Sequence, residues 1–436
     1  MQADYSAKLR TADDAADFLS PGTDISMGMA LGEPPGLLQA INKRLEIGEL
    51  DDLRLWYFHS MPAAAMTVLR YEMMDRVKPH CMFLGPTERA LMEMGEAEGK
   101  KVINFVPVAF SDAPRLFSQH IQLDTFITTV SPMDRHGYFS LGTNNDYAST
   151  AARTARQTIV EVNENMPRVF GDSMIHISEV DAVIENHTPL FEMPDHPVKP
   201  EEKQIAQTIA DLVPDGACLQ MGIGALPNEV CTMLTDRTDL GIHTELLSPG
   251  MVDLIEAGAV SNRRKTTFPG LTVFTFALGN KRMYDLLDDN PSFNSHPVNI
   301  VNDPRHIAKN DNVISINATL QVDLTGACNS ENLAGRQYSG SGGQLDFVRG
   351  ARASNGGRSI IACTSTARQG AVSRIVPELT GPVTTPRNDV DTVITEYGTA
   401  SLIGLSGEAR VRAMISLAHP DHRKDLTDAA RKLRLI

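Results

Sequence analysis

Short apolar runs alternate along the chain with longer segments in which apolar residues recur at helical spacing. The runs at residues 24–29, 101–106 and 217–221 all have glycine or proline close by. Alternation of this kind predicts an α/β fold whose sheets are mainly parallel.

One helix is predicted in detail between Pro200 and the Pro-Asp-Gly segment at residues 214–216. Two glutamates follow Pro200 in the first turn, where proline and acidic side chains are favoured. Ile205 and Ile209 fall on one face, and the proline and glycine at 214–216 end the helix. We expect its apolar stripe to pack on a sheet.

Three prolines within residues 194–200 disfavour both a helix and a central strand, so this segment is predicted to be a linker. A chain of 436 residues is also longer than one hydrophobic core usually supports. We therefore predict two domains, residues 1–195 and 196–436. Each half contains a strand that ends in Met-Gly before a loop and a helix, which fits two similar domains in tandem.

The composition excludes several classes of function. Hydrophobic residues make up 42% and charged residues 22% of the chain, as in ordinary globular proteins. A net charge of −14 argues against a nucleic-acid or anionic-membrane partner, since both need a dense positive surface. The five cysteines show no C-x-x-C pair and no metal-like spacing, which indicates a reduced compartment and no metal site. Because neither a signal peptide nor a membrane span is evident, we expect a soluble cytoplasmic protein.

The segment QMGIGALPN, at residues 220–228, lies between a predicted strand and a predicted helix. Glycines at such a junction let backbone N–H groups approach a ligand, and the N-terminus of the helix favours an anion. An NAD-dependent oxidoreductase is one interpretation, but a dinucleotide fingerprint would need glycine where Pro227 stands. A tight turn that binds no ligand is another.

Residues 241–245 are predicted to form a strand that ends at Glu245, before a Ser-Pro-Gly turn and a helix. Side chains at the carboxyl ends of strands in open α/β sheets face the ligand crevice. Glu245 and the glycines of segment 222–224 could therefore share one crevice. A lone carboxylate at a strand end is also common at surfaces and helix caps.

A second glycine cluster lies at residues 335–347, where Gly340, Gly342 and Gly343 fall within four residues. Such a loop can present successive N–H groups to an oxyanion, or it can be a flexible surface loop. Arg368 follows a strand predicted at residues 359–363, where a guanidinium can hold phosphate or simply be solvated.

Together these segments resemble the acetyl-CoA hydrolase/transferase family, the class I CoA-transferases that include 4-hydroxybutyrate, acetate and succinyl-CoA transferases. The matching segments run in order along nearly the whole chain, at residues 130–142, 161–168, 241–245, 329–331, 340–347, 372–377, 387–391, 394–398 and 418–420.

The resemblance implies two tandem open α/β domains with the active site between them. It also implies a catalytic glutamate at the position of Glu245, and CoA as a co-substrate without a tightly bound cofactor. The first half would hold the acyl or acid pocket, and the second half the glutamate and the CoA site. The residues at the family's CoA-contacting positions are Gln220, Met221, Gly222, Ile223, Gly224, Ser339, Gly342, Gly343 and Arg368.

The acid that accepts CoA is predicted from the loops at residues 27–35 and 58–61, with Met29, His59 and Met61 in the acyl pocket. Their methionines depart from the smaller residues expected in the 4-hydroxybutyrate branch, although methionine also fills cores. The chain looks more like the itaconate CoA-transferases, which use succinyl-CoA as donor. An acetate or 4-hydroxybutyrate transferase, an acyl-CoA hydrolase and a catalytically silent CoA-binding protein are alternatives. A homodimer or higher homo-oligomer is expected.

Overall fold

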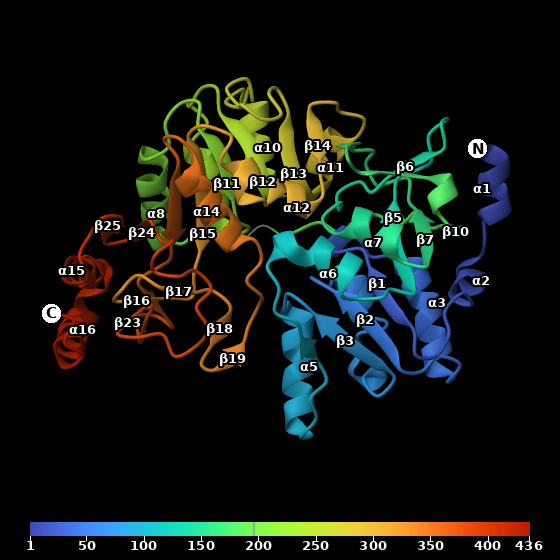
Figure 1. Ribbon diagram of the computed structural model, residues 1–436, viewed down its shortest axis with the longest axis horizontal. Helices are drawn as coiled ribbons and strands as arrows, with labels where there is room; N and C mark the ends of the chain where they lie inside the picture. The colour runs from blue at the N-terminus through green and yellow to red at the C-terminus, as the bar shows by residue number, and fades with distance from the viewer. Residues whose placement is uncertain (195–196) are drawn as a thin grey trace. The chain divides into compact units, whose positions relative to one another are not determined.

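The computed structural model describes residues 1–194 and 197–436 (Figure 1). The described residues form two compact units. One contains Met1–Met193 and Val273–Ile300, and the other contains Pro194–Thr272 and Val301–Ile436. The boundary predicted near residue 195 lies outside the described residues, so the division into 1–195 and 196–436 stays a prediction.

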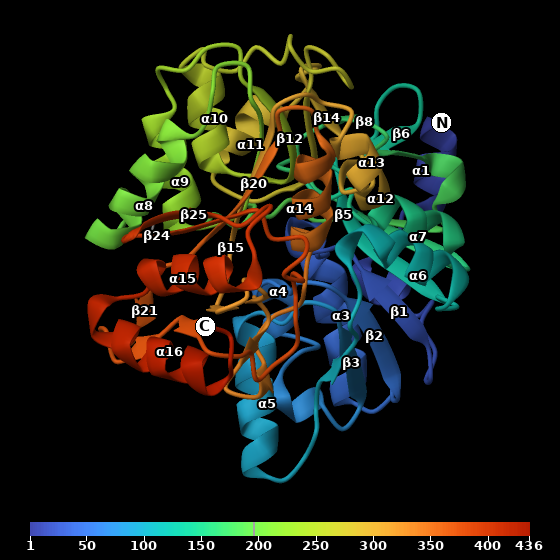
Figure 2. The ribbon, with the colours of Figure 1, turned by 60° about the vertical axis from the view of Figure 1, so that its left-hand side comes forward.

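The first unit is built on a seven-stranded sheet in the order β10-β7-β5-β1-β2-β3-β4, and each neighbouring pair is parallel. The chain moves outward from β1 to β4 on one side, and β5, β7 and β10 then follow on the other side of β1. Figure 2 shows β1, β2 and β3 side by side. The strands are β1 (Asp24–Met27), β2 (Leu53–Tyr57), β3 (Val77–Cys81), β4 (Asn104–Phe105), β5 (Thr125–Val130), β7 (Gln157–Val162) and β10 (Ala182–Glu185).

Helices and short strands complete the first unit. Leu37, Ile41 and Leu45 recur at helical spacing on α3 and are buried in the core with the sheet residues Leu55 and Ile127. Each fully buried side chain of this size contributes about 1.5–3 kcal/mol to the stability of the fold.

The helices of the first unit are α1 (Gln2–Lys8), α2 (Ala12–Ala16), α3 (Pro35–Glu46), α4 (Pro62–Ala65), α5 (Pro86–Ala97), α6 (Ala113–Gln119), α7 (Ala148–Thr154) and α11 (Lys281–Leu287). The short strands are β6 (Tyr138–Ser140), β8 (Phe170–Gly171), β9 (Met174–His176) and β14 (Phe293–Ser295). Two further elements, β13 (Thr272–Ala277) and α12 (Val298–Val301), lie at the ends of segment 273–300.

In the sheet of the second unit, six strands lie side by side in the order β25-β24-β20-β15-β11-β12. The pairs from β24 to β12 are parallel, and β25 returns antiparallel beside β24. These strands are β11 (Cys218–Met221), β12 (Gly241–Leu247), β15 (Val313–Ala318), β20 (Arg358–Ala362), β24 (Thr392–Thr395) and β25 (Gly398–Ser401). The prediction of an α/β fold with mainly parallel sheets is confirmed.

Helices and short strands likewise surround the second sheet. The helices are α8 (Pro200–Asp211), α9 (Ala225–Met233), α10 (Pro249–Glu256), α13 (Pro304–Ile307), α14 (Gln344–Ala353), α15 (Gly407–Leu417) and α16 (Pro420–Lys432). The short strands are β16 (Gln321–Asp323), β17 (Cys328–Asn329), β18 (Asn332–Leu333), β19 (Arg336–Gln337), β21 (Thr366–Ala367), β22 (Val372–Ser373) and β23 (Ile375–Val376). In the described ranges, 1–194 and 197–436, we find no helix with the length and apolar character of a membrane span.

Helix α8 confirms the helix predicted from the sequence. It begins at Pro200 and ends at Asp211, and Ile205 and Ile209 are fully buried. The Glu202 carboxylate accepts a hydrogen bond of 2.9 Å from the Lys199 backbone N–H, which satisfies one of the donors left open at a helix N-terminus.

The two Met-Gly segments occupy equivalent places in the two sheets. β1 lies between β5 and β2, and β11 lies between β15 and β12, so each strand is followed along the chain by strands on both of its sides. The point at which the strand order reverses is where open α/β sheets bind ligands, just beyond the carboxyl ends of the strands. The loops after β1 and β11 therefore lie where a fold of this kind binds its ligand.

Candidate active site

Glu245 lies on β12, and its side chain keeps partial access to solvent while its neighbours Thr244 and Leu246 are buried. The predicted strand end at Glu245 is wrong, because β12 continues to Leu247. The helix that follows begins at Pro249, where its missing N–H costs no hydrogen bond.

Two residues from distant segments hold the Glu245 carboxylate. The fully buried Asn302 follows α12, and its Nδ2 donates a hydrogen bond of 2.6 Å to Glu245 Oε2. The backbone N–H of Gly343, at the start of α14, also donates to the carboxylate. A Cβ at Gly343 would overlap Glu245 Oε2 and Asn302 Nδ2, so only glycine fits there. On β12, the ring Nε2 of His243 bonds the Val301 carbonyl at 2.8 Å and fixes the residue next to Asn302.

Burial raises the pKa of Glu245 from its usual 4.5 to about 7. The Asp346 carboxylate also raises this pKa, whereas the hydrogen bonds from Asn302 and Gly343 lower it. Both protonation states are thus populated near neutral pH. A largely buried carboxylate that keeps partial access to solvent and has oriented neighbours can act as a nucleophile or as an acid–base group.

The glycine loop between β11 and α9 is open to a ligand. A Cβ at Gly222 would meet no atom within 4 Å, and Gly224 caps α9 with a φ of 126° that side chains rarely adopt. Ile223 is half exposed beside them. This loop, with the ends of β15 and β20, lines a pocket of about 240 Å³ at the reversal of strand order.

The two residues before the glycines face the protein interior. Gln220 pairs its side-chain amide with that of Asn317 in both directions, at 3.2 and 3.1 Å. Met221 is fully buried, and its sulfur lies 3.5 Å from the Cys231 sulfur. Gln220 therefore fixes Asn317, which itself lines the pocket.

A second pocket of about 720 Å³ shares Thr364 and Arg374 with the first. Arg368 lies on its wall, in the turn of the β21–β22 hairpin, with φ of 51°. The predicted position of Arg368 at the end of the strand at 359–363 is wrong, because β20 ends at Ala362. Within residues 1–194 and 197–436 its guanidinium has no hydrogen-bond or ion-pair partner. Lys199 and Arg374 add two more cations to a lining that also contains the carboxylates of Glu201 and Glu396. With three cations against two carboxylates, this pocket can hold an anion locally on an acidic protein.

The residues of the second glycine cluster have two different environments: Ser339 is held by hydrogen bonds to its own loop, and Gly343 lies beside Glu245. The Ser339 N–H donates to the Glu331 carbonyl at 3.1 Å, and the Gln337 side chain donates to the Ser339 carbonyl at 3.1 Å. Gly342 has φ of 55°, which favours glycine. Gly343 lies beside Glu245 and donates its N–H to the carboxylate, while Asp346, in the same segment, acts on Glu245 through its charge.

The three predicted pocket residues of the first unit lie in loops that follow adjacent strands. Met29 comes after β1, whereas His59 and Met61 come after β2. Both methionines are buried, and the Ala30 N–H donates to the His59 carbonyl at 3.3 Å, which brings the two loops together.

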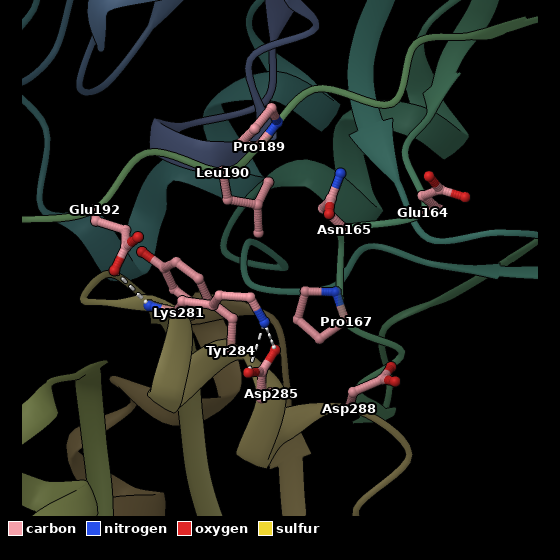
Figure 3. A pocket seen from close by; sticks show the side chains of 10 residues that line it. All are labelled: Glu164, Asn165, Pro167, Pro189, Leu190, Glu192, Lys281, Tyr284, Asp285 and Asp288. Atoms are coloured by element: carbon pink, nitrogen blue, oxygen red, sulfur yellow. Dashed lines mark hydrogen bonds and ion pairs between the residues drawn. The ribbon is translucent and has the colours of Figure 1, made fainter.

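A further pocket of about 300 Å³ in the first unit contains none of the predicted residues (Figure 3). Four carboxylates and one lysine are among its lining side chains. The ammonium of Lys281 bonds both oxygens of Asp285 at 2.7 Å, as Figure 3 shows. A lining of this charge would repel an anionic ligand.

Two family models match the chain. The acetyl-CoA hydrolase/transferase N-terminal domain matches residues 1–192, and the acetyl-CoA hydrolase/transferase C-terminal domain matches residues 279–430. The chain belongs to the acetyl-CoA hydrolase/transferase family. It is therefore an enzyme, a CoA-transferase that acts between an acyl-CoA and a carboxylate and uses CoA as a co-substrate.

Several relatives and solved structures align with nearly the whole length of this chain. The chain is 43% identical to succinyl-CoA:cyclohexane-1-carboxylate CoA transferase of Geobacter metallireducens, over 100% of this chain and 98% of the relative. It is 40% identical to 4-hydroxybutyrate coenzyme A transferase of Clostridium kluyveri, over 98% of each chain. The crystal structure of RipA from Yersinia pestis is 57% identical and covers 100% of this chain and 99% of its own, with a TM-score of 0.95. The structure of 4-hydroxybutyrate CoA-transferase from Porphyromonas gingivalis is 35% identical, with 99% of each chain covered and a TM-score of 0.84.

Sequence reasoning missed two residues of the transferase that the structure places at the candidate site. Asn302 lies 57 residues from Glu245 and belongs to no recognisable motif, so only the fold brings the two together. Arg374 lines both pockets. Its segment, residues 372–377, carried part of the family resemblance, and that was the one signal that could have found it.

Proposed function

We propose that the transferase moves CoA from succinyl-CoA to itaconate through a glutamyl-CoA thioester on Glu245. The observation that carries this proposal is the partly exposed Glu245 carboxylate, held by Asn302 and Gly343. The donor is supported by the family, which includes relatives named for succinyl-CoA. The assignment of itaconate as the acceptor is supported by the bulky loop residues Met29 and Met61.

The chemistry consists of four nucleophilic steps at carbonyl carbon. The Glu245 carboxylate attacks the thioester, which forms a mixed anhydride and releases CoA thiolate. The thiolate attacks the glutamyl carbonyl, which gives glutamyl-CoA and frees succinate. Itaconate then attacks glutamyl-CoA to form a new anhydride and thiolate. The thiolate finally attacks the itaconyl carbonyl, so itaconyl-CoA leaves and Glu245 is restored.

Each tetrahedral intermediate needs donors aimed at its oxyanion. We assign this role to the backbone N–H groups of segments 222–224 and 342–343. Asn302 Nδ2 joins them, because it already lies 2.6 Å from a carboxylate oxygen of Glu245. Removing one such donor from an enzyme typically costs about 100- to 1,000-fold in rate.

We assign to CoA the two pockets of the second unit that share Thr364 and Arg374. The glycine loop at 222–224 lets a chain-like ligand approach the backbone, and the cations of the larger pocket suit its phosphates. The nucleotide end would supply binding energy far from the reacting thioester.

The pH dependence follows from the raised pKa of Glu245. Because the nucleophile must be ionised, we expect kcat/KM for succinyl-CoA to rise with pH through about 7. Below that pH the ionised fraction, and with it kcat/KM, should fall about tenfold per pH unit. Asp346→Asn removes a negative charge that raises this pKa, so its profile should shift to lower pH. Initial rates across the pH range measure both effects.

Asp421→Asn is the control for this experiment, because Asp421 is 85% exposed on α16. Its pH profile should match that of the wild type. A wild-type rate that does not depend on pH near 7, or an unshifted profile for Asp346→Asn, would contradict the assignment.

Arg368→Ala should raise KM for succinyl-CoA about tenfold with little change in kcat, because a phosphate contact far from the thioester is lost. Steady-state kinetics at two salt concentrations test this. Arg412→Ala, on the exposed face of α15, is the matched control and should leave KM unchanged. An unchanged KM in Arg368→Ala would remove Arg368 from the CoA site.

The acceptor is tested with a panel of acids, with succinyl-CoA as donor. Succinate, itaconate, acetate, butyrate and 4-hydroxybutyrate are compared by kcat/KM, and itaconate should give the highest value. Acetate preference without itaconate turnover would reject the itaconate assignment. Turnover that depends on the acceptor, without net release of CoA, separates a transferase from a hydrolase.

We also propose a cytoplasmic location and a homo-oligomeric state. All five cysteines are buried and free, which suits a reduced compartment. Light scattering of the purified protein tests the oligomeric state.

A further inference from the structure

Two buried glutamates of the first unit, Glu33 and Glu88, hold the same loop from two sides. We call residues 58–61 the β2 loop; it follows β2 and contains His59 and Met61. Glu33 is 3% exposed and Glu88 is fully buried. Neither glutamate has a part in the chemistry proposed for Glu245.

Glu33 ties the β2 loop to the loop that follows β1. Its Oε1 accepts a hydrogen bond of 2.7 Å from the Met61 N–H, and its Oε2 accepts one of 3.0 Å from the Ala64 N–H. The Glu33 carbonyl is itself anchored, because Thr129 Oγ1 on β5 donates to it at 2.7 Å.

Glu88 ties the β2 loop to the loop that follows β3. Its Oε1 accepts hydrogen bonds from the Tyr57 hydroxyl at 3.1 Å and from Ser60 Oγ at 2.5 Å. Its Oε2 accepts one of 2.7 Å from the Gly85 N–H. Two residues of segment 57–60 and one of the next loop therefore share a single carboxylate.

The His59 ring lies next to Gly85, the residue whose N–H donates to Glu88. A Cβ at Gly85 would come within 3.0 Å of Glu88 Oε2 and 3.1 Å of the ring carbon Cε1 of His59. The ring thus packs on the bare backbone of Gly85. In the described part of the chain its Nδ1 is buried and has no hydrogen-bond partner.

Helix capping accounts for the contacts of Glu33, since Met61 is the N-cap of α4 and Ala64 lies in its first turn, but it does not account for all the contacts of Glu88. Because α4 begins directly after the β2 loop, the capping bond to the Met61 N–H still fixes the end of that loop. Glu88 caps α5 in a similar way, but it also binds two hydroxyl groups on and beside the β2 loop. A buried carboxylate that accepts from several segments fixes their relative positions, since leaving any donor unpaired is costly.

We propose that Glu33 and Glu88 are positioning residues for acid selection. They clamp the β2 loop between the loops that follow β1 and β3, and so set the positions of His59 and Met61 against the carboxylic acid. The inference rests on the proposed function, which places these residues in the acyl pocket. The carboxylates act through the loop and do not touch the acid.

Glu33→Gln and Glu88→Gln test the clamp, because each amide keeps the shape of the side chain but offers an N–H where a donor now bonds. At saturating succinyl-CoA, kcat/KM is measured for acetate and for the best larger acid of the panel. The ratio of larger acid to acetate should fall about tenfold, the discrimination that one methylene-sized pocket contact gives. The value for acetate should change little. Ser60→Ala removes one hydrogen bond to Glu88 and should shift the ratio in the same direction by a smaller factor.

Asp24→Asn is the matched control, because Asp24 is the first residue of β1 and bonds the side chains of Arg54 and Trp56 within β2 rather than the β2 loop. It should leave the ratio unchanged. If Glu33→Gln and Glu88→Gln fold and the ratio of larger acid to acetate is unchanged, the clamp is overturned. If they do not fold, an unchanged ratio in Ser60→Ala overturns it. An equal loss of kcat/KM for both acids also overturns it. Mass spectrometry of wild-type Glu245 after incubation with acyl-CoA tests the proposed mechanism separately. A missing adduct there would reject the mechanism without altering the acid ratio.

Discussion

Glu245→Gln should lower kcat by on the order of 10⁴-fold or more, because an amide cannot attack a thioester to form an anhydride. The substitution keeps the shape of the side chain and the oxygen that Asn302 can bond. The initial rate of CoA transfer measures the loss. Hydroxylamine should inactivate the wild type only after exposure to acyl-CoA, and it should have no effect on the variant.

Glu408→Gln is the control for this substitution. Glu408 is exposed on α15 and lines neither CoA pocket, so its change tests whether removing any negative charge from the second unit matters. We expect its rate to stay within about threefold of the wild type. If Glu245→Gln kept more than about 1% of the activity, another group would have to be the nucleophile.

Gly343→Ala should cost about 100- to 1,000-fold in kcat, the loss typical of one oxyanion donor. A methyl group here would overlap Glu245 Oε2 and Asn302 Nδ2, so both the nucleophile and its neighbour must move. A shift of about 1 Å at reacting groups is enough for a loss of this size. Steady-state kinetics should show the loss in kcat, with a smaller effect on KM for succinyl-CoA.

Gly407→Ala provides the matched control, since a Cβ there would meet no atom within 4 Å. Gly407 is the first residue of α15, far along the chain from Glu245, and alanine is a good helix former. Its kcat and thermal midpoint should equal those of the wild type. A Gly343→Ala variant with the kinetics of Gly407→Ala would mean that the site tolerates a side chain beside Glu245.

Local sequence predicted the elements whose ends carry strong signals. Helix α8 was predicted correctly because Pro200, a single apolar stripe and a Pro-Asp-Gly stop all agree. The end of β12 was predicted too early, since Glu245 looks like the polar residue that closes a strand. The structure keeps it in the strand because tertiary contacts with Asn302 and Gly343 offset the polarity of the side chain.

The candidate site was predictable only in part, for a related reason. The glycines of segment 222–224 predict a turn before a helix, and in the structure that turn lines a pocket. Asn302 has no such signal, because an asparagine gains its role only from the carboxylate that the fold brings to it. Arg368 was expected at a strand end, but a hairpin turn carries it instead, and turns of this kind have weak sequence signatures.

The hydrogen bond from Asn302 to Oε2 makes the two oxygens of Glu245 distinguishable between turnovers. In the proposed reaction, the oxygen that bridges each anhydride leaves with the departing acid and is replaced from the incoming one. With Oε2 held in place, Oε1 would take every bridging position. Heavy oxygen supplied in the acceptor would then pass through a single atom of the enzyme and emerge in the acid released one cycle later, while Oε2 kept its original isotope.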